Sequence, residues 1–230
     1  MYELSGRIGF SEGGADGRLH WHQLINYFQN TSTFHIEDMG IDFLDSKIGF
    51  YMLAWQLDIK RLPLVGEKVV TGTHIHEMRA IYGSRNYWMK SVAGELLVQA
   101  HMTGCFMDLA AQKLYKLTDE EAKKLPLAKK LDMDYLPRKI KLPPLTESFS
   151  PVLVSARHID SYQHVNNAEY LAVASNYIPI DLNVSTIRIE YKKAAVVGEY
   201  LYPKGARVGD TYYLALADEN ENPYALLSFS

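Results

Sequence analysis

The residues best suited to chemistry lie in one short stretch, Arg157–Tyr170. Within it stand a carboxylate, Asp160, an imidazole, His164, and the predicted start of a helix at Asn167. Free N–H groups and the positive dipole end at a helix start favour an anion or a carbonyl oxygen. The pattern therefore predicts acid–base chemistry on a carbonyl group. The structural alternative is that Asp and Asn serve as caps beside a solvated His.

Two predicted elements position these side chains. A strand over residues 151–157 leads into the stretch, and a helix follows from Asn167 to about Asn176. Asn166 fits the N-cap position, and Glu169 stands three residues later, which is the spacing of a capping box. We therefore expect a strand, a tight turn and a capped helix to hold Asp160 near His164.

Length and composition are those of a globular protein. The chain has 230 residues, 47% hydrophobic and 22% charged, which suits one large domain or two small ones. No apolar run is long enough for a membrane span, and the first residues do not read as a secretory signal. The single cysteine, Cys105, excludes an internal disulfide and a thiolate metal cluster. We expect a soluble, cytoplasmic protein.

The net charge of −3 argues against nucleic-acid binding, but the charge is unevenly distributed. Residues 123–141 contain seven basic side chains against Asp132 and Asp134, a local excess of about +5. Such a segment is either a solvated connector, the interpretation that we favour, or a landing patch for an acidic partner.

The first half of the chain predicts an α+β unit. A strand over residues 2–10 and a helix over residues 19–37 come first. Four segments rich in Val, Ile, Tyr and Trp then follow and read as strands: 50–60, 68–78, 84–91 and 96–108. A strand, a long helix and consecutive strands indicate an antiparallel sheet wrapped around one helix.

The second half repeats this order. Trp55–Glu67 aligns with Ile187–Glu199 without a gap, and Leu4–Arg7 aligns with Val154–Arg157 ahead of the turn and the helix. Two agreements in the same order indicate a duplication.

The duplication divides the chain into three parts. We expect an N-terminal unit at 1–117, a basic, proline-containing linker at 118–147, and a C-terminal unit at 148–230 that carries the candidate site. A helical turn can begin in the linker after Thr118.

The chain resembles the acyl-acyl carrier protein (acyl-ACP) thioesterases of plants and bacteria. Asp160–Asn167 is similar to that family's Asp-x-Asn-x-His-Val-Asn-Asn, and Arg188–Lys193 to its Leu-Glu-Tyr-Arg-Arg strand. In the first half, Asp16–Arg18, Leu24–Gln29 and Arg85–Met89 also match its pattern. The resemblance covers nearly the whole chain. It implies a tandem (double) hotdog fold and hydrolysis of fatty acyl-ACP to free fatty acid and carrier protein, without a cofactor, in fatty acid biosynthesis.

The resemblance also implies site residues. In the family, the Asp, Asn and His of the motif and an acidic residue after the later strand serve hydrolysis. Asp160 and His164 are retained here, whereas Tyr162 replaces the Asn and Ala194–Ala195 replaces the family's Glu-Cys pair. Nucleophilic catalysis by a cysteine at that position is excluded, because alanine has no thiolate.

The remaining groups suit water-based hydrolysis of a thioester. Asp160 would orient or deprotonate the water, His164 would assist as acid, base or hydrogen-bond partner, and Tyr162 could donate a hydrogen bond in place of the missing amide. The developing oxyanion would be held by backbone amides at the helix start, those of Val165, Asn166 and Asn167.

Substrate contacts follow from the same expectation. The aromatic residues of the first unit, Trp55 among them, can line a slot for the fatty chain, although core packing is the commoner use of such residues. Carrier proteins are acidic, so Lys192 and Lys193 are candidate contacts. An acyl-CoA thioesterase and a weakly active or non-catalytic acyl or carrier-protein binder are the alternatives. The sequence leaves a homodimer open.

Metal chemistry has little support. His20 and His22 alternate at a predicted helix, and His74 and His76 alternate on a strand, but neither pair has further ligands at metal-site spacing. Cys105 stands in an apolar strand and reads as an inert thiol. We expect no metal.

Overall fold

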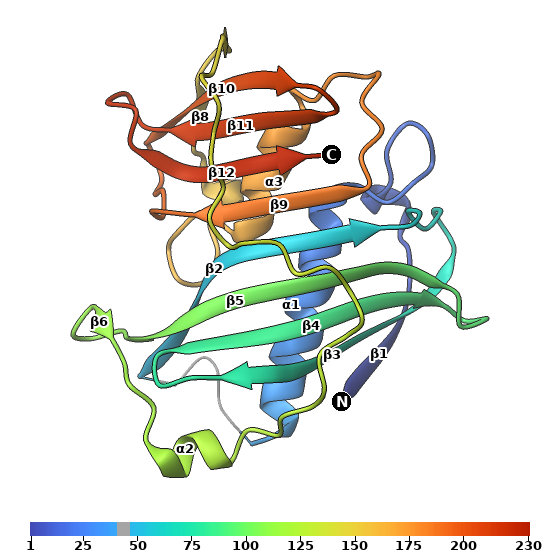
Figure 1. Cartoon of the computed structure of the whole chain (residues 1–230), viewed down its shortest axis with the longest axis vertical. Helices are drawn as coiled ribbons and strands as arrows, with labels where there is room; N and C mark the ends of the chain where they lie inside the picture. The colour runs from blue at the N-terminus through green and yellow to red at the C-terminus, as the bar shows by residue number, and fades with distance from the viewer. Residues whose placement is uncertain (41–46) are drawn as a thin grey trace. The chain divides into compact units, whose positions relative to one another are not determined.

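The structure is a computed structural model that describes residues 1–40 and 47–230. The chain forms two compact units, one made of residues 1–53 and 57–136 and the other of residues 54–56 and 137–230. Each unit contains one main helix and an antiparallel sheet (Figure 1).

The first unit places its strands in the order β1-β3-β4-β5-β2, and the short β6 pairs with β5. Its elements are β1 (Tyr2–Arg7), η1 (Phe10–Glu12), α1 (Trp21–Asp38), β2 (Ile48–Ile59), β3 (Lys68–Met78), β4 (Tyr82–Ser91), β5 (Leu96–Asp108), β6 (Lys113–Leu114) and α2 (Asp119–Lys123). The strands predicted at 68–78 and 96–108 are confirmed as β3 and β5. Thr118 is the N-cap of α2, as predicted.

Helix α1 covers one face of this sheet because its apolar side chains recur at helical spacing. Leu24, Phe28 and Thr31 are fully buried. The Phe28 ring lies 5.2 Å from that of Tyr87 on β4, and the hydroxyls of Thr31 and Thr71 are 2.8 Å apart. The core of the first unit therefore lies between α1 and the sheet.

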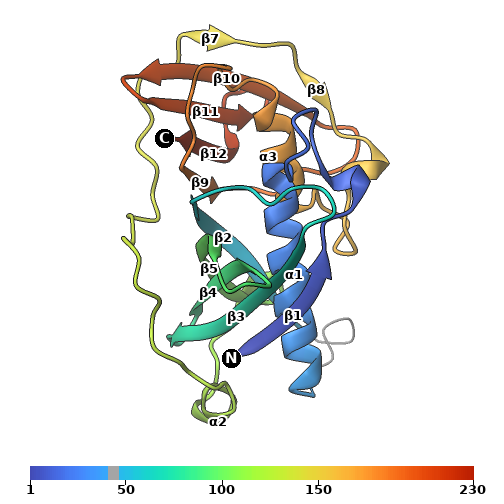
Figure 2. The ribbon, with the colours of Figure 1, turned by 90° about the vertical axis from the view of Figure 1, so that its right-hand side faces the viewer.

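The opposite face of the same sheet is crossed by residues 127–136, which we call the strap (Figure 2). The Ala128 amide donates to the Ile75 carbonyl at 2.8 Å, and the Leu131 amide donates to Asn86 Oδ1 at 3.2 Å. The Tyr135 hydroxyl donates to the same Asn86 oxygen at 2.9 Å. One buried amide side chain on β4 thus holds two points of the strap.

Gly72 on β3 is required by the ring opposite it. Its register partner on β4 is Trp88, and a Cβ at Gly72 would lie 2.0 Å from Trp88 Cε2. Substitution of Gly72 by alanine is expected to lower the free energy of unfolding by about 2–3 kcal/mol, because an overpacked core must shift. Urea unfolding measures this. Gly6→Ala on β1, where the nearest atom would lie at 3.5 Å, is the matched control, and equal midpoints for the two variants would contradict the prediction.

The second unit orders its strands β9-β12-β11-β10-β7, and β8 pairs with β10. Its elements are β7 (Glu147–Ser148), β8 (Val152–Leu153), η2 (Ala156–His158), α3 (Asn167–Ser175), β9 (Thr186–Tyr191), β10 (Tyr200–Val208), β11 (Thr211–Ala217) and β12 (Pro223–Phe229). Helix α3 packs on β11 and β12 through buried residues that include the small Ala168 and Ala174.

The strand predicted over 151–157 is too long. Only Val152–Leu153 pair in a sheet, because the chain turns into the 3-10 helix η2 immediately afterwards. That turn is held by buried His158, whose Nδ1 accepts the Ser155 amide at 3.0 Å.

One loop is built twice in the chain, as Ile8–His20 and as Val154–Asn166. Five backbone hydrogen bonds that join residues within each loop recur at matching positions in the two copies. Each loop contains a 3-10 turn, η1 or η2, and each ends where a main helix begins. The duplication predicted from the sequence is therefore present in the backbone.

Of the two alignments predicted between the halves of the chain, the structure confirms one and contradicts the other. The alignment of Trp55–Glu67 with Ile187–Glu199 is confirmed, because Gly66 and Gly198 make equivalent hydrogen bonds, to Ile8 O at 2.8 Å and to Val154 O at 3.0 Å. The alignment of Leu4–Arg7 with Val154–Arg157 is wrong. Val154 takes the place of Ile8, four residues further along, and the shared Ser and Arg were coincidental.

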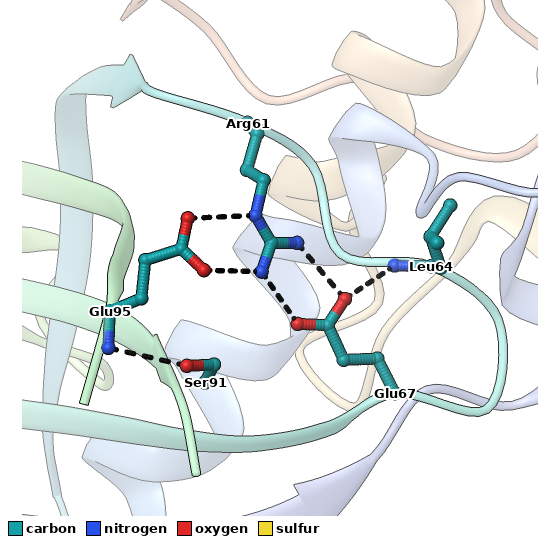
Figure 3. Close-up of polar contacts among 5 residues, drawn as sticks. All are labelled: Arg61, Leu64, Glu67, Ser91 and Glu95. Carbon is teal, nitrogen blue, oxygen red and sulfur yellow. Dashed lines mark hydrogen bonds and ion pairs between the residues drawn. The ribbon is translucent and has the colours of Figure 1, made fainter. Parts of the chain in front are cut away.

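The turn before β3 shows what the two copies share (Figure 3). Arg61 lies between two carboxylates, with Nη2 at 2.9 Å from Glu67 Oε1 and 2.6 Å from Glu95 Oε2, and Glu67 also accepts the Leu64 amide at 2.9 Å. Glu67 thus joins the arginine to the backbone of its own turn.

The second unit keeps the glutamate and changes its cation. Glu199 accepts the Val196 amide at 2.9 Å, as Glu67 accepts that of Leu64. Lys193 stands where Arg61 stands in the first copy, and it pairs with Asp218 at 3.8 Å. The turn geometry is retained while its ion pairs differ.

Candidate active site

Asp160 lies in the tight turn between η2 and α3. Its amide donates to the His164 carbonyl at 2.8 Å, its carbonyl accepts the Gln163 amide at 3.0 Å, and its Oδ1 accepts the Tyr162 amide at 2.9 Å. Gln163 adopts a φ of 63°, where the equivalent residue of the first loop is Gly17 with a φ of 73°. A non-glycine residue in this strained region is a feature that concentrates at functional sites.

Burial raises the pKa of the Asp160 carboxyl above its ordinary value of 3.8. Hydrogen bonds from the Tyr162 and His164 amides and the nearby charge of His164 oppose the shift, but burial is the largest cause. A carboxylate with a raised pKa accepts a proton more readily, which suits a general base.

The predicted trio occupies one turn. Tyr162 and His164 are both half-buried, as Asp160 is, and His164 lies close enough to Asp160 to affect the pKa of its carboxyl. The spacing of the motif brings the three together because a single tight turn spans all of them.

The start of α3 follows the sequence prediction in part. Asn166 is the N-cap, and its Oδ1 accepts the Ala168 amide at 2.9 Å. The predicted reciprocal bond from the Asn166 amide to Glu169 is not formed, because that amide donates to the His158 carbonyl at 2.8 Å.

The amides expected to hold an oxyanion are only partly available. The Val165 amide donates to the Ala195 carbonyl at 2.9 Å and the Asn166 amide donates to His158, so neither can serve in this loop conformation. Within residues 1–40 and 47–230, the Asn167 amide has no hydrogen-bond partner. It is the remaining backbone donor at the helix start.

The first copy of the loop lacks the acid. Gly14 stands at the place of Asp160, Arg18 at that of His164 and Asp16 at that of Tyr162. Gly14 nevertheless makes the same hydrogen bond, to the Arg18 carbonyl at 2.8 Å. The backbone of the loop therefore does not depend on Asp160, and the second copy alone carries its carboxylate.

Comparison with known proteins decides the family. The sequence model of the acyl-ACP thioesterase N-terminal domain matches residues 1–125, and that of the C-terminal domain matches residues 145–209. The chain belongs to the acyl-ACP thioesterase family. None of the curated proteins matches it.

Solved structures share the fold. An acyl-ACP thioesterase from Bacteroides thetaiotaomicron superposes with a TM-score of 0.89 at 16% identity, covering 99% of this chain and 96% of that one. A 12:0-ACP thioesterase from Umbellularia californica gives 0.86 at 16% identity, with 100% and 96% covered. A putative oleoyl thioesterase from Lactobacillus plantarum gives 0.85 at 19% identity, with 99% and 94% covered. The predicted double hotdog is confirmed.

Family membership makes this chain a thioester hydrolase acting on fatty acyl-ACP, as the sequence predicted. Among the described residues, no helix is long and apolar enough to cross a membrane. Among these described residues, no three His, Cys, Asp or Glu side chains form a group that could hold a metal ion.

The structure gives three of the predicted contacts of the thioesterase surroundings within the chain, while their roles toward substrate and carrier stay predictions. Lys192 lies 2.6 Å from Oε1 of Glu190, a carboxylate that is almost fully buried and also accepts the Ile140 amide. Lys193 pairs with Asp218 and lies over the Tyr224 ring at 4.9 Å. Trp55 is 2% exposed within β2, a burial typical of a core residue.

The sequence prediction missed Tyr170 in the thioesterase. This buried residue of α3 accepts the Ala195 amide on its hydroxyl at 2.8 Å. A signal was present in the sequence, since Tyr170 is an aromatic in a helix otherwise rich in small residues. The register of the duplication, in which Tyr170 is the equivalent of Leu24, is visible only in the backbone.

Proposed function

We propose that the thioesterase hydrolyses its substrate by direct attack of water, with Asp160 as general base. Asp160 takes one proton from the water as its oxygen bonds to the carbonyl carbon, and the carbonyl electron pair moves onto oxygen. Collapse of the tetrahedral intermediate breaks the C–S bond, and the carrier thiolate takes a proton that His164 or the Asp160 carboxyl delivers. The products are a fatty acid and the carrier thiol.

The observation that carries this proposal is the half-buried carboxylate of Asp160 in a turn shared with His164. The raised pKa of the Asp160 carboxyl supports its role in proton transfer. The Asn167 amide is the backbone donor proposed to hold the oxyanion. The phenol of Tyr162 stands in the same turn and can donate a hydrogen bond. Ala195 excludes a cysteine nucleophile at this position, which favours water as the attacking group.

We also propose that the enzyme works in the cytoplasm in fatty acid biosynthesis. Carrier-bound acyl chains are the substrate class that the family implies, and the composition is that of a globular protein. The basic side chains of residues 123–141 remain candidates for contact with an acidic carrier, since Lys192 and Lys193 have internal partners.

A second function, hydrolysis of acyl-CoA, is favoured by one observation: Lys192 and Lys193, the predicted carrier contacts, each have an acidic partner within the chain. The test compares hydrolysis of carrier-bound and CoA-bound esters of one acyl chain by purified protein. We expect kcat/KM to be at least roughly tenfold higher for the carrier ester, because only the carrier adds protein contacts.

Equal values for the two esters would favour the CoA enzyme. Saturable binding of acyl-ACP without turnover would favour a non-catalytic binder. Added salt tests the basic segment, because contacts between exposed charges weaken as ionic strength rises.

A further inference from the structure

Both backbone groups of Ala195 are tied to the segment that contains the candidate site. The Ala195 carbonyl accepts the Val165 amide at 2.9 Å, and the Ala195 amide donates to the Tyr170 hydroxyl at 2.8 Å. Ala195 is fully buried and Tyr170 is 2% exposed. The residue that replaces the family's cysteine is thus fixed from two sides, by the loop and by the helix that follows it.

The internal duplication shows that the loop can fold without the tyrosine contact. In the first copy, the Leu19 amide donates to the Pro63 carbonyl at 2.9 Å, the same bond that Val165 makes to Ala195. Pro63 has no N–H to donate, and the residue at the place of Tyr170 is Leu24, which has no hydroxyl. The copy that carries Asp160 therefore has both the amide donor, on Ala195, and the hydroxyl acceptor, on Tyr170. The first copy has neither.

Tyr170 lies near enough to two carboxylates, one of them Asp160, for them to affect the pKa of its phenol. Burial, with the nearby carboxylates of Asp160 and Glu199, raises the pKa of the Tyr170 phenol to about 12, so the hydroxyl stays protonated at working pH. Its ring packs edge-on against Tyr191 at 5.7 Å, and the Tyr191 hydroxyl donates to the Asn167 carbonyl at 2.9 Å. Two tyrosines thus fix the first turn of α3.

We propose that Tyr170 is a positioning residue, whose hydroxyl fixes the Ala195 backbone and through it the Val165 amide, so that Asp160 stays half-buried in its working position. The inference rests on the proposed function, because it assigns to Asp160 the role of base. Tyr170 acts through Ala195 and does not contact the substrate.

The test removes the hydroxyl alone, with Tyr170→Phe. We expect kcat to fall roughly 10- to 100-fold with little change in KM, because small displacements of a catalytic group have effects of that size. The acid limb of the kcat/KM profile should move to lower pH, since a loosened loop buries Asp160 less and burial is what raises its pKa. An unchanged rate and an unchanged acid limb would overturn the proposal.

A matched control separates positioning from stability. Tyr212 is also fully buried in the second unit, and its hydroxyl donates to Glu147 Oε2 at 2.7 Å. Tyr212→Phe should lower stability while leaving kcat and the acid limb as in the wild type. If Tyr212→Phe reproduced the change of rate and of acid limb, both would be stability effects and the role of Tyr170 would be overturned.

Two measurements do not need turnover, so they stand even if the proposed function fails. The titration midpoint of Asp160, followed by carbon-13 NMR, should drop toward 3.8 in Tyr170→Phe, and an unchanged midpoint overturns the positioning role. If that variant does not fold, hydrogen exchange of the backbone amides in the wild-type protein tests the proposal instead. The Ala195 amide should exchange as slowly as that of Leu214 in the inner strand β11, and fast exchange overturns the proposal.

Discussion

Asp160→Asn is expected to lower kcat for acyl-ACP about a thousandfold, because an asparagine at this position cannot accept the proton of the attacking water. The fold should remain, since the equivalent loop of the first copy forms around Gly14 with the same backbone hydrogen bond. Steady-state turnover of acyl-ACP, with circular dichroism as a check of folding, measures the effect.

The pH dependence of the wild type gives a second view of the same group. Asp160 must be ionised to act, and burial raises the pKa of its carboxyl. The acid limb of kcat/KM should therefore fall at a pH above 3.8, the ordinary value for aspartate. The matched control is Asp16→Asn, an exposed acid in the first copy of the loop, which should leave turnover unchanged. Full activity of Asp160→Asn would remove this residue from the mechanism.

The strap of the first unit is expected to make the protein sensitive to acid. His76 and His101 lie beneath it, with ring centroids 5.2 Å apart, and the Tyr135 ring lies 4.9 Å from that of His101. Within the described residues, neither ring nitrogen of His76 has a hydrogen-bond partner, and the same holds for Nε2 of His101. Burial lowers the pKa of both imidazoles to about 4.

The sign of the effect follows from proton binding. Between pH 6.5 and 4 the unfolded chain protonates both histidines while the folded chain keeps them neutral, so the free energy of unfolding falls as pH falls. Most nearby charges also oppose protonation of the two histidines. The pKa of His76 is lowered by His101, Lys130 and His74, and that of His101 is lowered by Lys130, while Glu77 raises both. After a discount for partial solvation, we expect a loss of about 2–3 kcal/mol between pH 7 and pH 5.

The measurement is urea unfolding at pH 7 and pH 5, with amide exchange of Ala128 and Leu131 to localise the change to the strap. The double variant His76→Gln/His101→Gln should lose most of this pH dependence. His20→Gln, a change at an exposed position, should keep it. A double variant with the same acid sensitivity as the wild type would assign the effect to other groups.

Local patterns predicted much of the fold. The strands β3 and β5 were predicted at their observed bounds because runs of β-branched and aromatic residues ended at clear turns. The N-caps Thr118 and Asn166 were also predicted correctly, since a cap is a contact between residues two or three positions apart. Where the physics is local, the sequence contains the answer.

Other expectations failed where distant segments compete for the same group. The amides of Val165 and Asn166 looked free at a helix start, but carbonyls of Ala195 and His158 accept them. Lys192 likewise has a partner that local patterns did not reveal, the buried carboxylate of Glu190, and its contact with a carrier stays a prediction. A buried polar group needs a partner, and the partner can come from anywhere in the chain.

The amino-acid order by itself determined the family, the duplication and the turn that carries Asp160, His164 and Tyr162, because these depend on neighbours in the chain. Only the tertiary structure decided the true register of the repeated loop, the strap over His76 and His101 and the contact of Tyr170 with Ala195. Those features join residues 25 or more positions apart, and no periodicity specifies which distant donor will meet which acceptor once the sheet closes on its helix.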